Sequence, residues 1–66
     1  MTIKNVQTCI ESIRNTTREC IKNNDKESFS VLMKAERELE KIHFNRTGQQ
    51  YNKRPAYKSF KKMESN

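Results

Sequence analysis

The chain has 66 residues, of which 32% are apolar and 33% charged, and its formal net charge is +6. A chain this short buries only about 60% of its unfolded surface, so it forms one small domain at most and gains from a partner or from self-association. It has neither the run of roughly 20 apolar residues that a membrane-spanning helix needs nor an apolar block at its N-terminus, so we expect a cytoplasmic protein with no membrane contact.

The first expected element is a helix over residues 3–22. Thr2 is a suitable N-cap, and Asn23-Asn24 follows as a helix end, because asparagine tolerates the left-handed conformation that closes helices. Apolar positions recur at steps of three and four residues, and they are Ile3, Val6, Ile10, Ile13, Thr17 and Cys20. The other face is polar and includes a predicted basic ridge spaced by four residues, made of Arg14, Arg18 and Lys22.

A second helix is expected over residues 25–44, opened by a capping box in which Asn24 is the cap and Glu27 reaches back. Its apolar stripe is Leu32, Ala35, Leu39 and Ile42, with Phe29 and Met33 beside it. The outer face mixes both signs of charge and holds Lys34, Glu36, Arg37, Glu38, Glu40 and Lys41. A link of about two residues makes the helices antiparallel neighbours, so residues 1–45 are predicted to form an all-α helical hairpin. Self-association or a protein partner is expected to cover what the two stripes leave exposed.

Residues 46–66 form a second region, which is basic and contains three aromatic residues. Six of its side chains are basic and one is acidic, so it carries +5 of the total charge of +6. Pro55 can occupy the first position of a helix, which allows a short third helix over residues 55–63. The alternative is a tail that folds only on its target.

Positive charge with planar rings between the charges suits a phosphate backbone with exposed bases. Stacking requires unpaired bases, so single-stranded or structured RNA is favoured over duplex DNA. The sequence therefore favours a small RNA-binding regulatory or accessory protein. Its candidate nucleic-acid-binding residues are Arg14, Arg18, Lys22, Arg46, Tyr51, Lys53, Arg54, Tyr57, Lys58, Phe60, Lys61 and Lys62.

Other interpretations of the same residues stay open. The basic region can be a solvated end with Phe60 packed on the hairpin, or it can contact an acidic protein surface. The apolar excess on the helices is also typical of a protein-interaction module or inhibitor that docks on an enzyme or a nucleoprotein complex, as small phage or plasmid regulators do. The two functions are compatible if the partner itself binds RNA.

The residue patterns of catalysis and metal binding are missing from the sequence. His43 has no nucleophile or acid motif beside it and is expected to pack or cap at the end of the second helix. Cys9 and Cys20 are separated by about 16 Å along one helix, more than double the roughly 7 Å that a disulfide allows between Cα atoms. We expect reduced thiols, no metal, no cofactor, no small-molecule substrate and no enzyme activity.

Overall fold

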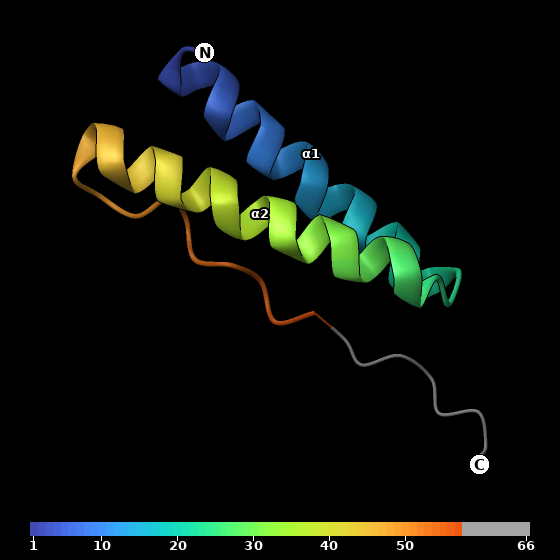
Figure 1. Ribbon diagram of the computed structural model, residues 1–66. Helices are drawn as coiled ribbons and strands as arrows, with labels where there is room; N and C mark the ends of the chain where they lie inside the picture. The colour runs from blue at the N-terminus through green and yellow to red at the C-terminus, as the bar shows by residue number, and fades with distance from the viewer. Residues whose placement is uncertain (58–66) are drawn as a thin grey trace.

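The computed structural model describes residues 1–57, which form two antiparallel helices with an irregular segment lying along them (Figure 1). Helix α1 spans Ile3–Lys22 and α2 spans Lys26–Thr47. The expected all-α hairpin is therefore confirmed. Residues 58–66 lie outside the described part of the chain, and with them most of the expected third helix. The first three residues of that expected helix, 55–57, have no regular secondary structure.

Helix α1 begins and ends where the sequence predicts. Thr2 is the N-cap, and its side-chain oxygen accepts a hydrogen bond from the backbone N–H of Asn5 at 3.1 Å. At the other end, Asn24 adopts a left-handed backbone with φ of +57°. The N–H of Asn24 donates to the carbonyl of Ile21, and the N–H of Asp25 donates to the carbonyl of Cys20 at 2.8 Å. This pair of bonds is a Schellman motif, which satisfies the last carbonyls of the helix.

The start of α2 differs from the expected capping box. Asp25, one residue later than expected, is the N-cap and accepts a bond from the N–H of Ser28 at 3.1 Å. Asn24 cannot cap α2 because it already occupies the left-handed position that ends α1. The helix also runs to Thr47, beyond the expected end at residue 44, and closes at Gly48, whose φ is +76°. The helix thus continues past Phe44 until Gly48 adopts the left-handed backbone conformation that ends it.

The core between the helices is narrow and only partly apolar. The apolar positions of α1 point into it as expected, with Val6, Ile10, Thr17 and Cys20 buried. From α2, however, the buried side chains are Glu36 and His43. The expected apolar stripe of α2 consists of Leu32, Ala35, Leu39 and Ile42. The first three of these side chains are half-buried, and Ile42 is 37% exposed. Placing Glu36 on the outer face was therefore wrong.

The rotation of α2 has a physical cause on α1. Arg14 follows Ile10 by four residues and therefore shares its face, so it too is buried. A buried guanidinium needs a carboxylate partner, and Glu36 lies only 100° around α2 from the expected stripe. Turning α2 to bring Glu36 inward moves the apolar stripe to one side. No helix in the described part of the chain is long and apolar enough to cross a membrane.

Candidate nucleic-acid interface

After Gly48 the chain turns back and runs along one side of the hairpin (Figure 1). We call residues 49–57 of this segment the strap. Hydrogen bonds from several points of the strap tie it to both helices through two tyrosine hydroxyls, an arginine and backbone carbonyls. The strap holds four members of the predicted nucleic-acid-binding set, which are Tyr51, Lys53, Arg54 and Tyr57.

Arg14 joins the two helices and the strap at one point. Its Nε donates to Glu36 at 2.7 Å, and its Nη2 donates to Glu40 at 3.2 Å and to the carbonyl of Asn52 at 2.7 Å. The side chains of Arg14 and Glu36 are only 5% and 0% exposed. Burial lowers the pKa of Arg14, but the bonds to Glu36 and Glu40 outweigh it and raise the pKa. The sequence placed Arg14 on an exposed ridge; the structure corrects this, because Arg14 is buried and fully engaged.

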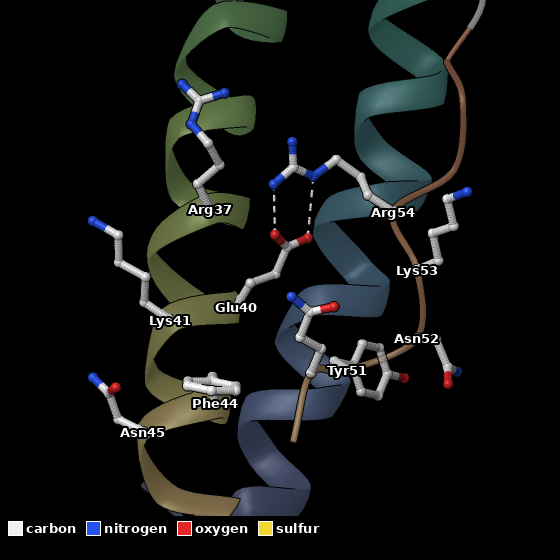
Figure 2. A pocket seen from close by; sticks show the side chains of 10 residues that line it. Arg37, Glu40, Lys41, Phe44, Asn45, Tyr51, Asn52, Lys53 and Arg54 are labelled. Carbon is white, nitrogen blue, oxygen red and sulfur yellow. Dashed lines mark hydrogen bonds and ion pairs between the residues drawn. The ribbon is translucent and has the colours of Figure 1, made fainter. Parts of the chain in front are cut away.

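Arg54 and Tyr57 fasten the strap to two of the carboxylates of α2, those of Glu40 and Glu36. Arg54 forms a bidentate pair with Glu40, with bonds of 2.6 and 3.2 Å (Figure 2). Burial raises the pKa of Glu40, yet the hydrogen bonds from Arg54 and Arg14 more than offset this and lower it. The hydroxyl of Tyr57 donates to the second oxygen of Glu36 at 2.9 Å. Burial and this bond raise the pKa of Tyr57 to about 12.

Tyr51 and His43 close the strap at the open end of the hairpin. The hydroxyl of Tyr51 donates to Glu11 at 2.5 Å, and its ring lies 5.3 Å from the guanidinium carbon of Arg14. The ring edge also meets His43, with centroids 5.4 Å apart. His43 is buried, with Nδ1 3.0 Å from the carbonyl of Gln49. Because a carbonyl only accepts, Nδ1 carries the proton, and Nε2 accepts from the amide of Gln7.

The internal bonds divide the predicted nucleic-acid-binding set. Arg14, Tyr51, Arg54 and Tyr57 are engaged within the chain, and Tyr57 also meets the ring of Phe29 edge-on at 6.1 Å. Their contact with nucleic acid stays a prediction that this arrangement does not favour. The described members that remain exposed are Arg18, Lys22, Arg46 and Lys53. Two of them also donate within the chain, Arg18 to the side chain of Asn15 and Arg46 to the carbonyl of Met1. The members that lie outside the described residues are Lys58, Phe60, Lys61 and Lys62.

Two shallow grooves flank the strap, and cationic side chains line both. The groove between the strap and α2 is shown in Figure 2, where Phe44 of α2 lies across the groove from Tyr51 of the strap. Its cations are Arg37, Lys53, the paired Arg54 and Lys41, which forms an exposed ion pair with Glu38 at 3.6 Å. The groove on the α1 side is lined by strap residues 55–57 and by five residues of α1, which are Asn15, Arg18, Glu19, Ile21 and Lys22. We call the strap with its two grooves the strap face.

Sequence reasoning missed the contribution of α2 to the strap face. Arg37, Lys41 and Phe44 were not among the candidate residues, although all three are exposed and Phe44 is 50% exposed. Their spacing of four and three residues places them along one side of a helix. That spacing was readable in the sequence, but only the path of the strap beside α2 shows that they line a groove.

No protein-family model, curated protein or solved structure matches this chain. Within residues 1–57, no group of three or more histidine, cysteine, aspartate or glutamate side chains is placed to hold a metal ion. Cys9 and Cys20 are free thiols on α1, and burial raises the pKa of Cys20. The chemistry of the strap face is therefore that of charge, hydrogen bonding and one exposed ring.

Proposed function

We propose that this chain is a small RNA-binding protein of a regulatory or accessory kind, and that it binds through the strap face. One observation supports this most: exposed cations line both sides of the strap and outnumber the exposed carboxylate in the grooves, Glu19, whereas Glu36 and Glu40 beneath the strap are bonded to arginines and a tyrosine. Phosphate groups on this face would meet positive charge on three segments of the chain. Those segments are α1, α2 and the strap, and their cations are Arg18, Lys22, Arg37, Lys41 and Lys53.

Single-stranded RNA suits this face better than a duplex does. Lysine and arginine neutralise phosphates and release counterions, which provides affinity for any strand. Phe44 is half exposed between cations and next to the amides of Asn45 and Gln50, which line the same groove. An unpaired base can stack on such a ring and bond to such amides, whereas a base in a duplex cannot reach them. Phe44 thus takes the role that the sequence suggested for Tyr51 and Tyr57.

Fluorescence anisotropy with a short labelled single-stranded RNA tests the proposal. The test variant is Arg37→Gln with Lys53→Gln, and the matched control is Lys4→Gln with Lys34→Gln, which removes the same charge away from both grooves. The test variant should bind more weakly and lower the log–log salt slope by roughly 1.4, at about 0.7 for each lost phosphate contact. Phe44→Ala should cost about 1–3 kcal/mol of binding free energy.

Equal weakening by the test and control variants would show that affinity follows net charge alone and that the strap face is not the site. The same strand made of DNA measures the preference for RNA. An affinity pull-down of the intact chain, with and without nuclease, distinguishes an RNA target from a protein target. If an acidic protein is still recovered after nuclease treatment and the pure chain binds no RNA, the target is a protein surface and not RNA.

A further inference from the structure

The side of the hairpin opposite the strap is apolar and carries no charged side chain at its centre. Residues of α1 and α2 share this side, since one shallow cleft is lined by Thr16, Cys20, Val31 and Leu32. Near the turn between the helices the same cleft is bordered by the carboxylates of Glu19, Asp25 and Glu27. Glu11 and Arg14 point instead toward the strap. The other members follow from helical spacing of three and four residues. We call this set the back face; it consists of Cys9, Ile13, Thr16, Val31, Leu32, Ala35, Leu39 and Ile42.

The back face leaves apolar area in water that the hairpin alone does not cover. Val31 is 61% exposed and Ile42 is 37% exposed, and most of the other members are half-buried. The apolar side chains that the described residues do bury are few, namely Val6, Ile10 and Cys20. A core of this size does not stabilise a chain of this length by itself, so further burial of apolar surface is needed.

We infer that a second copy of this chain covers the back face, so that two hairpins form a four-helix dimer. Each helix is about 30 Å long and about 10 Å wide with its side chains, so the two helices side by side present a back face on the order of 600 Å². That is close to the roughly 800 Å² that each partner buries in a stable protein interface. Half-buried aliphatic side chains at helical spacing are also what the core of a four-helix bundle is made from.

The charge distribution favours a second copy over other occupants. The chain carries +6, but none of the eight residues of the back face is charged. Two copies can therefore meet there while their cationic strap faces point in opposite directions, which keeps like charges apart. An acidic protein or a nucleic acid would be attracted to the strap face instead. The back face thus needs an uncharged apolar partner surface, which a second back face provides at the chain's own concentration.

Sedimentation equilibrium of the nuclease-treated full chain at high salt tests the inference, because those conditions remove any association through RNA. The expected mass is twice that of one chain. Val31→Glu with Ile42→Glu should give monomers, because both side chains are exposed in the single hairpin and their replacement leaves its core intact. The matched control is Phe44→Glu, which adds a charge at a similarly exposed apolar residue on the strap face and should remain dimeric.

A thermal midpoint that rises with protein concentration is expected for the parent chain and for Phe44→Glu, because dimerisation stabilises the folded state by mass action. If the glutamate variant loses its helical circular-dichroism signal, Val31→Ser with Ile42→Ser replaces it, and its dimer should dissociate at least about tenfold more readily. A parent chain that is a cooperatively folded monomer would overturn the inference. So would open-ended assembly, or a serine variant that dimerises as tightly as the parent chain.

Discussion

Arg14 is the side chain on which both helices and the strap converge. It donates to two carboxylates and a carbonyl, and Tyr51 lies against its guanidinium. Removing such a pair from water costs several kcal/mol per ion, which good geometry only partly offsets. The chief effect of the Arg14–Glu36 pair is therefore to fix how α1 packs against α2, since only one alignment of the helices brings Arg14 to Glu36.

The first prediction is that Glu36→Gln destabilises the fold by about 3–5 kcal/mol, because it leaves the buried Arg14 without its nearest counter-charge. Replacing both, as Arg14→Met with Glu36→Leu, should recover most of that loss. Urea unfolding followed by circular dichroism measures both variants. A double variant that is no more stable than Glu36→Gln would show that the ion pair itself contributes net stability.

The second prediction concerns Tyr57, whose pKa is raised to about 12 by burial and by its bond to Glu36. Because the folded pKa exceeds the ordinary value of about 10, this hydroxyl contributes stability below pH 10 that is lost as the pH rises toward 12. Ultraviolet titration of the parent chain should show a tyrosinate step near pH 12 that Tyr57→Phe removes. A parent chain whose tyrosines both titrate near 10 would place Tyr57 in water.

The sequence contained part of this residue-level picture. Arg14 continues the series Val6, Ile10 at a step of four residues, which is a signal for burial. Arg18 follows by the same step and is exposed, so the series alone does not separate the two arginines. What separates them is Glu36 on the other helix. A long-range pair of this kind has no local signature, and it could not be read from the repeat.

At the scale of elements, Gly48 decides where α2 stops and the strap begins. Its φ is +76°, and a Cβ added there would meet no atom within 4 Å. The third prediction is that Gly48→Ala lowers the free energy of unfolding by about 1 kcal/mol through backbone strain alone. Gly48→Asn should cost less, because asparagine tolerates this conformation. Equal losses in chemical denaturation would point to a cause other than the backbone.

The strap also acts as a structural element, since its bonds cover the carboxylates of α2. The fourth prediction is that a chain ending at Gly48 has a lower thermal midpoint than the full chain, because Glu40 loses Arg54 and Glu36 loses Tyr57. The matched control ends at Tyr57 and keeps every bond of the strap. If both truncations lower the midpoint equally, the stabilising contacts come from residues 58–66.

Both helices and their antiparallel packing could be predicted because the signals are local. Thr2 caps α1 and Asn24 ends it, and the repeat of apolar residues gives the helical period. The strap gave no such signal. Its position depends on Tyr51, Arg54 and Tyr57 finding partners between 14 and 40 residues away. The basic residues there were consequently interpreted as a free surface, although Arg54 is paired with Glu40.

On the scale of the whole molecule, the cationic strap face and the apolar back face lie on either side of two paired carboxylates, those of Glu36 and Glu40. The pairing makes stability sensitive to acid. Burial raises the pKa of Glu40, but bonds to Arg54 and Arg14 lower it overall. A lowered folded pKa means that this carboxylate contributes stability above its ordinary value of about 4.3, and the contribution is lost as the pH falls below it.

The fifth prediction is that the thermal midpoint falls as the pH is lowered below about 4.3, and that Glu40→Gln reduces the size of this fall. The variant should already be less stable at neutral pH, where the parent chain has its paired carboxylate. Midpoints measured across the acid range in one buffer system give the comparison. An identical acid profile in both chains would show that Glu40 does not contribute to it.

The chain of contacts through Arg54, Glu40, Arg14, Glu36 and Tyr57 also limits how this sequence can drift during evolution. Loss of one member leaves a charge or a hydroxyl without its partner, whereas joint loss of two partners can be nearly neutral. Related sequences should therefore change Arg14 together with Glu36, and Arg54 together with Glu40. Exposed lysines such as Lys34 face no such constraint, so correlated substitution at the four ion-pair positions would mark true relatives even where overall identity is low.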